Sequence, residues 1–168
     1  MESSALARFE AVVLPHLDAA YTLARYLMRN PQDAEDVVQD ACLRALKYFE
    51  GFRGEEETSA RGWLLTIVRN TANSWHKRHH PDTLAVEFDE NQHSDDVTDE
   101  RPEAKETLGR ALERLAPEFR EVIVLRELQG LSYKEISDVA GVPVGTVMSR
   151  LSRARARLQE ALREEEVR

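Results

Sequence analysis

The residues best suited to chemistry lie near the C-terminal end of the chain, in the segment from Val144 to Leu158. This segment contains four arginines and no acidic residue, although the whole chain has a formal net charge of −8. An arginine side chain can donate two hydrogen bonds to a guanine edge or hold a phosphate group. The chemistry that the segment offers is therefore the binding of nucleic acid, and the alternative is a basic helix face exposed to solvent.

The same segment has the spacing of a helix with one packed side and one polar side. The packed side holds Val147, Leu151, Ala154 and Leu158. The opposite side is small or basic, with Gly145, Ser149, Ser152, Arg153 and Ala156 at its centre, Thr146, Arg150 and Arg157 on one edge, and Met148 and Arg155 on the other. Small residues would let this helix enter a major groove, so the pattern favours DNA binding.

The elements before this helix are of the kind that would position it on DNA. Ser132 is followed three residues later by Glu135, which predicts a capping box at the start of a helix over 132–140. Gly141 and Pro143 then interrupt the chain before the basic helix. A helix, a short glycine-containing turn and a longer helix form the helix-turn-helix pattern.

A second acid-free segment runs from Arg61 to His80, and most of it lies in a helix predicted over about 60–77. Its basic residues could follow a nucleic-acid backbone while planar side chains receive unstacked bases. Tryptophan side chains are usually largely buried, which favours core or hinge positions for Trp63 and Trp75 over base stacking. The spacing of His76 and His80 would permit a metal, but no neighbouring cysteine or acid completes a ligand set, so a basic helix end is favoured and no metal or cofactor is expected.

A helix predicted from Pro31 to about Phe49 has an acid-rich first half, which contains Asp33, Glu35, Asp36 and Asp40. Acids in a first turn often serve only the helix dipole. Together with Gln39, Arg44 and Lys47 they could instead form a polar docking face over a buried stripe of Val37, Ala41, Ala45 and Phe49. The sequence leaves these two readings open.

The rest of the sequence predicts an all-α chain without a membrane span. Further helices are expected over 5–29, with Leu6 among its inward residues, over 105–115 and over 117–128. The whole net charge of −8 is accounted for by residues 82–103, which we predict to be a flexible acidic linker. The single cysteine, Cys42, is expected to be buried in the core, and the absence of a signal pattern favours a cytoplasmic location.

The run "LRELQGLSYKEISDVAGVPVGTVMSRLSRARARL" closely resembles the promoter-binding domain of bacterial extracytoplasmic-function sigma factors. The stretches "DAEDVVQDACLRALKYF" and "RGWLLTIVRNTANSWHKRHH" resemble the polymerase-docking and −10 segments of the same family. The resemblance covers about 145 residues in the family's order. It implies an N-terminal helical bundle, region 2 (residues 1–80), an acidic linker (81–103) and a helix-turn-helix domain, region 4 (104–168).

The resemblance also implies partners and site residues for a protein that is not an enzyme. The expected partners are core RNA polymerase, through its β′ clamp helices and β flap, promoter DNA and an anti-sigma factor. The residues expected at polymerase are Asp33, Asp36, Gln39 and Asp40. Those expected at the −10 element are Arg61, Trp63, Arg69, Asn70, Asn73, Lys77 and Arg78, with the loop 52–59 walling a pocket for a flipped base. Those expected at the −35 element are Thr146, Met148, Ser149, Arg150, Ser152, Arg153, Arg155 and Arg157, where Met148 departs from the basic residue common in the family.

Two other functions fit the same features. A sigma-like module could titrate an anti-sigma factor without starting transcription, and a helix-turn-helix repressor could bind DNA without polymerase. A further hypothesis is that the acidic linker competes with DNA for the basic surfaces. In that case, neutralising Asp95, Asp96, Asp99 and Glu100 should raise the promoter affinity of the free protein.

Overall fold

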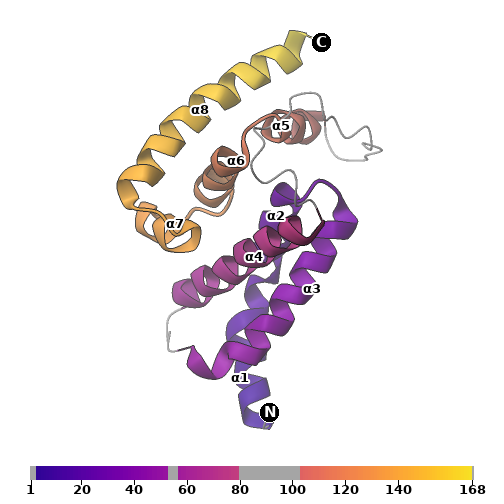
Figure 1. Cartoon of the computed structure of the whole chain (residues 1–168), viewed down its shortest axis with the longest axis vertical. Coiled ribbons are helices and arrows are strands. Elements are labelled where there is room, and N and C mark those ends of the chain that lie inside the picture. Colours follow the sequence, from indigo (N-terminus) through magenta and orange to yellow (C-terminus); the bar gives the residue numbers. More distant parts are fainter. Residues whose placement is uncertain (1–2, 53–56, 80–102, 168) are drawn as a thin grey trace.

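The chain is described here from a computed structural model, which places residues 3–52, 57–79 and 103–167. Every regular element within these ranges is helical, and Figure 1 shows the helices in two groups. The first group comprises α1 (Ser3–Val13), η1 (Leu14–His16), α2 (Leu17–Leu27), α3 (Pro31–Tyr48), η2 (Phe49–Gly51) and α4 (Glu57–His79). The second comprises α5 (Glu103–Glu113), α6 (Pro117–Ile123), η4 (Val124–Leu128), α7 (Tyr133–Ala140) and α8 (Val144–Val167).

The expected single helix over 5–29 is divided into α1 and α2, so that prediction was wrong in its continuity. Pro15 lies in the intervening turn, η1. A proline lacks the N–H that an α-helix needs and its ring clashes with the preceding turn, so the helix breaks there. Leu6, predicted to face inward, is 42% exposed near the free end of α1.

The N-terminal group, α1 to α4, packs around an apolar core that includes an aromatic cluster. The ring of Phe49 lies 5.4 Å from that of Phe9 and 5.9 Å from that of Phe52, between centroids. Trp63 packs on this cluster, 4.9 Å from Phe52. The stripe predicted for the second helix is confirmed, since Val37 and the residues that share its face are fully buried. These contacts fix α3 and α4 side by side.

The helix-turn-helix is built as its local sequence predicts. Ser132 accepts a hydrogen bond from the backbone N–H of Glu135, whose carboxylate accepts one from the N–H of Ser132. Gly141 ends α7 in the left-handed conformation, with φ of 70°. This conformation carries little cost only for glycine, so the turn between α7 and α8 depends on it.

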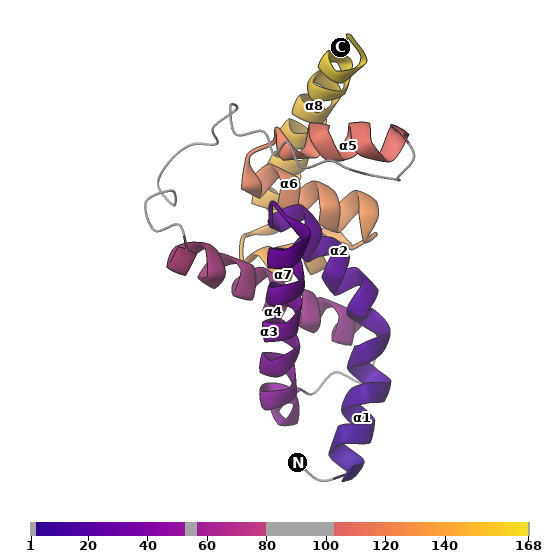
Figure 2. The same ribbon diagram turned by 90° about the vertical axis from the view of Figure 1, so that its right-hand side faces the viewer.

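The two groups of helices are in direct contact, with α4 against α7 and α2 against α6 (Figures 1 and 2). Arg120, which is 8% exposed, stabilises this contact. Its guanidinium donates hydrogen bonds to the carbonyl oxygens of Leu112, Glu113 and Leu115 and, from the other group, Tyr26. Burial lowers the pKa of Arg120 to about 10, which still leaves it charged near neutral pH.

Residues 81–102 of the predicted linker and 53–56 of the loop predicted over 52–59 lie outside the described residues. The helix α4 begins at Glu57, within the range predicted as loop. In the parts of the chain that the structure places, no helix combines the length and apolar character needed to cross a membrane.

Candidate nucleic-acid interface

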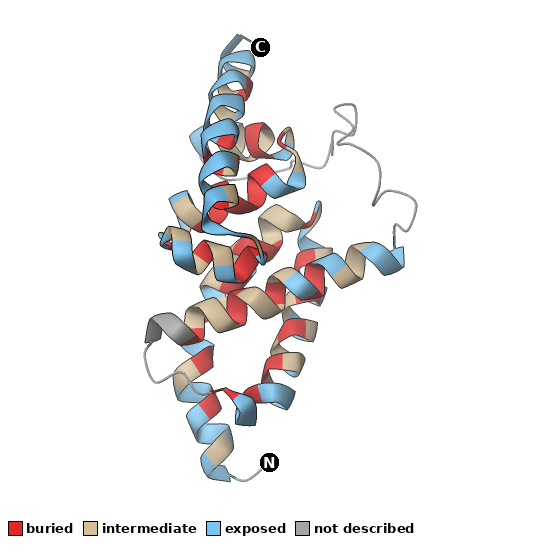
Figure 3. Cartoon of the chain, turned by 60° about the vertical axis from the view of Figure 1, so that its left-hand side comes forward, coloured by how far each residue is buried: buried red, intermediate tan, exposed pale blue. Residues whose placement is uncertain are grey.

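The helix α8 has the two faces that its sequence predicts. Val147, Leu151 and Ala154 are buried against the rest of the C-terminal group, and Leu158 is half-buried. Most of the opposite face is exposed, and the ribbon of α8 is largely pale blue in Figure 3. Thr146 and Arg150, on one edge of this face, are half-buried. The exposed residues of this face are Gly145, Met148, Ser149, Ser152, Arg153, Arg155, Ala156 and Arg157. The predicted DNA-facing side is therefore available to solvent and carries basic but no acidic side chains up to Arg157.

Two of the arginines expected at the −35 element are held by side chains of their own domain. Arg155 donates hydrogen bonds from Nε and Nη2 to one carboxylate oxygen of Glu127, at 3.0 and 2.9 Å. The guanidinium of Arg157 lies over the ring of Phe119, 5.0 Å from its centroid. These contacts orient both side chains along the domain surface, whereas Arg153 is exposed on the open face.

Glu121 connects the two helices expected to contact DNA. It is buried on α6, with 4% of its surface exposed, and its Oε1 accepts a hydrogen bond of 2.8 Å from Nε of Arg69 on α4. Burial raises the pKa of Glu121, while the charges of Arg69 and then Arg150 oppose that rise. A single carboxylate thus interacts with one arginine from the predicted −10 helix and one from the predicted −35 helix.

Arg61 is held by the C-terminal domain as well. Its Nη1 donates a hydrogen bond of 3.1 Å to the carbonyl of Gln129, and its Nη2 lies 3.9 Å from a carboxylate oxygen of Glu135. Gln129 in turn donates from its side-chain amide to the carbonyl of Ala19. Arg61 and Arg69 therefore face the C-terminal domain in this arrangement, and the sequence did not predict this.

The other residues expected at the −10 element lie on exposed parts of α4. Asn70, Asn73 and Lys77 are exposed and share one face, since they are spaced by three and four residues. Arg78 is exposed near the end of the helix. Trp63 is half-buried against the aromatic cluster, in agreement with the core or hinge position favoured from the sequence. Its indole packs on the core of the N-terminal domain.

The histidines at the end of α4 make contacts with the backbone. A ring nitrogen of His76 lies 3.2 Å from the carbonyl oxygen of Leu27, and Nδ1 of His79 lies 2.9 Å from that of Trp75. His79 also stacks on Trp75, with ring centroids 3.8 Å apart. Among the residues that the structure describes, no three histidine, cysteine or acidic side chains gather in a way that could hold a metal ion.

The acid-rich half of α3 forms an exposed polar surface, with one residue that also serves the helix start. Asn30 caps α3 by accepting a hydrogen bond from the N–H of Asp33, and its amide donates to the Asp33 carboxylate at 2.8 Å. Asp36 and Gln39 are exposed, and Asp40 forms an ion pair of 3.3 Å with Arg44. Asp33 thus has a structural contact in addition to its expected docking role.

Leu43 is a surface residue that the sequence reading missed. It is 68% exposed on α3, on the side that carries Asp36, Gln39 and Asp40. Its spacing from Val37 and Ala41 places it on the opposite side of the helix from the buried stripe. The sequence could therefore have predicted that Leu43 is exposed. Cys42, predicted to be in the core, is only half-buried, and this burial raises the pKa of its thiol.

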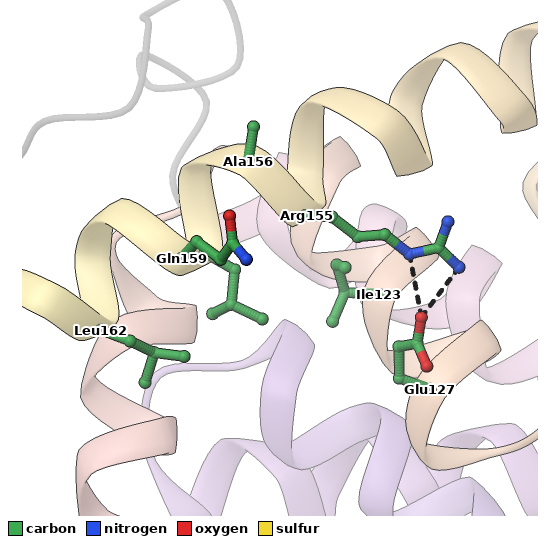
Figure 4. Close-up of a pocket in the computed structure, with 7 residues that line it drawn as sticks. Ile123, Glu127, Arg155, Ala156, Gln159 and Leu162 are labelled. Atoms are coloured by element: carbon green, nitrogen blue, oxygen red, sulfur yellow. Dashed lines mark hydrogen bonds and ion pairs between the residues drawn. The ribbon is translucent and has the colours of Figure 1, made fainter.

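A groove of about 420 Å³ runs between α8 and the helical segment α6–η4. Its lining is mainly apolar and is formed by Ile123, Glu127, Arg155, Ala156, Leu158, Gln159 and Leu162. Figure 4 shows the Arg155–Glu127 ion pair at one end of the groove and Leu162 toward the other. The groove lies on the C-terminal domain alone.

Two family models match the chain, one in each group of helices. The model described as Sigma-70 region 2 matches residues 12–81. The model described as Sigma-70, region 4 matches residues 105–158. These ranges contain α3 and α4 in the first case, and the helix-turn-helix with the basic part of α8 in the second.

Curated relatives match the chain over most of its length. The ECF RNA polymerase sigma factor SigE of Mycolicibacterium smegmatis is 32% identical over 96% of this chain, which spans 64% of that protein. The ECF RNA polymerase sigma-E factor of Haemophilus influenzae is 36% identical, with 83% of this chain and 79% of that protein covered. The ECF RNA polymerase sigma-E factor of Escherichia coli is also 36% identical, with 81% and 76% covered.

Solved structures match both groups of helices together. The sigma factor RpoE of Bartonella quintana, in a complex with the anti-sigma factor NepR, has a TM-score of 0.74 and 31% identity, with 93% of this chain and 97% of that chain covered. CnrH, in a complex with the cytosolic domain of CnrY, has a TM-score of 0.66 and 28% identity, with 93% and 88% covered.

Proposed function

The chain belongs to the extracytoplasmic-function family of RNA polymerase sigma factors, and from this premise we propose which surfaces bind polymerase and which read the promoter. Sigma factors are not enzymes themselves, because the polymerase performs the chemistry. The observation that carries the proposal is the exposed, acid-free face of α8 within a C-terminal domain that matches sigma region 4. We expect the protein to work in the cytoplasm, together with polymerase.

The docking surface for the β′ clamp helices is the exposed side of α3. Asp36, Gln39 and Asp40 supply polar contacts there, and Leu43, at the C-terminal end of this set, supplies an exposed apolar group. Interfaces commonly obtain most of their binding free energy from a few central residues that become desolvated. Leu43 is therefore the anchor of this contact, and the acidic residues give it orientation.

The −35 element is read by the N-terminal half of α8. In a helix-turn-helix the start of the second helix faces the base edges, which places Thr146, Ser149 and Arg150 in the major groove. Arg153, one turn further along, is exposed and can hold a base or a phosphate. Arg155 and Arg157 add positive charge beside the groove while they remain against Glu127 and Phe119.

The −10 element is read by α4 after the two domains separate. Asn70, Asn73 and Lys77 are already exposed, whereas Arg61 and Arg69 are held by the C-terminal domain. DNA can reach these two arginines only when α7 and α6 move away from α4. Binding to polymerase would supply the free energy for this opening, because docking sites on both domains would hold them apart.

The groove between α6 and α8 is the candidate site for the β flap. A flap segment would need an apolar recess on the C-terminal domain, and this groove offers one that borders the DNA-facing side at Arg155 and Ala156. Ile123, Leu158 and Leu162 provide such a recess. The Arg155–Glu127 pair at its end would fix the direction in which a helical segment lies in it.

Control by an anti-sigma factor is supported by the structural relatives. RpoE of Bartonella quintana was solved with the anti-sigma factor NepR, and CnrH with the cytosolic domain of CnrY. Both match this chain across its two domains. We propose that a protein of this kind binds the present chain and blocks its polymerase contacts.

The test is run-off transcription with core polymerase, the full chain and a library of promoter fragments. Promoter-specific transcripts that depend on the chain are expected, and their starts would give the −10 and −35 sequences. Binding to polymerase without any specific transcript would favour a module that only titrates an anti-sigma factor. Binding to DNA with no association with polymerase would favour a repressor.

A further inference from the structure

The start of α8 carries two exposed apolar side chains on the face that otherwise holds small and basic residues. Met148 is 52% exposed and Val144 is 39% exposed. Neither belongs to the hydrophobic core formed by the described residues. They are four residues apart, so they are neighbours on the helix surface. Together they form a small apolar patch within the first turns of the helix.

The position of this patch limits what it can contact. It lies at the N-terminal end of the second helix of a helix-turn-helix, the part that faces base edges in DNA complexes. The neighbouring residues Gly145 and Ser149 are small, and nothing lies within 4 Å of the place where a Cβ of Gly145 would be. The helix backbone can therefore approach a groove closely here, and Met148 is the more exposed of the two apolar side chains on this edge.

The chemistry of Met148 then selects one feature of the groove. A methionine side chain has no hydrogen-bond donor and its thioether is a weak acceptor, so it gains little from the polar edges of the bases. The apolar group on a base edge in the major groove is the 5-methyl group of thymine. The flexible thioether chain adapts to such a group without requiring one fixed rotamer.

We propose that Met148, supported by Val144, reads the 5-methyl group of a thymine in the −35 element. This inference rests on the proposed function, because it requires α8 to lie in the groove of that element. DNA is the occupant that the surroundings favour, since this face carries Arg150 and Arg153 and no acid. An apolar protein segment on the same patch is the alternative that the experiment must distinguish.

The experiment uses holoenzyme assembled from core polymerase and the full chain, bound to a promoter found by run-off transcription. Each −35 thymine, on either strand, is replaced in turn by uracil, which lacks only the 5-methyl group. One replacement should weaken the binding of wild-type holoenzyme about threefold to fivefold, the effect of burying one methyl group. The variant M148A should bind the normal promoter more weakly by a similar factor and should not respond to that replacement.

Two further variants control the interpretation. M148L keeps an apolar side chain of similar volume and should retain the response to uracil. V167A removes an exposed apolar side chain at the far end of α8 and should behave as wild type.

The outcomes separate this inference from the proposed function. A holoenzyme that transcribes the promoter but tolerates uracil at every −35 thymine overturns the methyl readout and leaves the proposed function intact. A loss in M148A that is equal on thymine and uracil, together with weaker binding to polymerase, would assign the patch to a protein partner and overturn it too. If wild-type holoenzyme gives no promoter-specific transcript, both fail together.

Discussion

Arg69 and Glu121 are joined across the domain boundary by a hydrogen bond of 2.8 Å between Nε and Oε1. Glu121 is 6% exposed at its side chain and Arg69 is 24% exposed. The carboxylate is therefore the more deeply desolvated partner of the pair. Burial raises its pKa against the opposing charges of Arg69 and Arg150, so the ionised form is held in place chiefly by these arginines.

The variant R69A should destabilise the protein with its two domains in contact, because it leaves the buried Glu121 carboxylate without its hydrogen-bond donor. A loss of about 3 kcal/mol in the free energy of unfolding is expected, toward the low end for a broken buried pair because Arg150 remains nearby. The double variant R69A/E121Q should recover most of this loss, since a neutral amide needs no counter-charge. Thermal unfolding of the four proteins in the cycle measures the coupling, and additive losses would contradict it.

The cost of R69A should depend on pH. The folded-state pKa of Glu121 lies above its ordinary value and should rise further when Arg69 is removed. A group of this kind contributes stability that is present at low pH and lost as pH rises through its folded-state pKa. The difference in stability between wild type and R69A should therefore shrink from pH 7.5 to pH 5.5. E121Q lacks the titrating carboxyl group and serves as the reference for the pH dependence of the rest of the protein. If the stability difference between wild type and R69A is the same at pH 7.5 and pH 5.5, Glu121 is not charged in the pair.

The variants R150A and R153A should weaken −35 recognition. Each arginine can supply a bidentate base contact or a phosphate contact, and the loss of either should lower promoter affinity of the holoenzyme by about tenfold or more. R163A is the matched control, because Arg163 is an exposed arginine of the same helix beyond the DNA-facing half. Promoter binding and abortive transcription measure the effect. Equal losses in all three variants would indicate a general charge effect instead of a local contact.

The variant L43A should weaken the binding of the chain to core polymerase. Truncating a central anchor of an interface costs about 2 kcal/mol or more, which is roughly thirtyfold in affinity. L6A is the control, since Leu6 is an exposed leucine on a different helix of the same domain, α1. Competition with labelled wild-type chain for core polymerase gives the affinities. Equal affinities of L43A and wild type would move the docking surface away from this side of α3.

The variant S132A should lower stability by about 1 kcal/mol, because it removes the side-chain acceptor that caps α7. Ser132 accepts from the N–H of Glu135 in the closed capping box. S152A is the control, as Ser152 is exposed within α8. Denaturant unfolding compares the two. A loss in S152A as large as that in S132A would show that the cap itself contributes little.

Local chemistry made much of the fold predictable. The capping box at Ser132, the glycine at 141 and the spacing of Val147 and Leu151 each act within a few residues, and the structure confirms them. Pro15 could have predicted the break between α1 and α2. The helical spacing of apolar residues on both sides of it led instead to the prediction of one continuous helix. The exposure of Leu43 could also have been predicted, from its position on the helix relative to the buried stripe.

The contact between the domains was not predictable from such patterns. Arg69 and Glu121 are separated by 52 positions, and each is an ordinary charged residue in its own helix. Arg120 is another example, since its carbonyl partners become known only when the chain is folded. The sequence placed Arg61 and Arg69 correctly on α4 but could not show that the other domain engages them.

The net charge of the long helix α8 changes sign along its length. Its first half ends with Arg157 and carries only positive charge, whereas Glu160, Glu164, Glu165 and Glu166 dominate the second half. A helix of 24 residues is about 36 Å long, several times the Debye length at physiological salt, so the two halves act on their surroundings independently. Phosphates attract one end and repel the other. The charge order of this single helix therefore favours contact between a phosphate backbone and its first half, and disfavours contact with its second half.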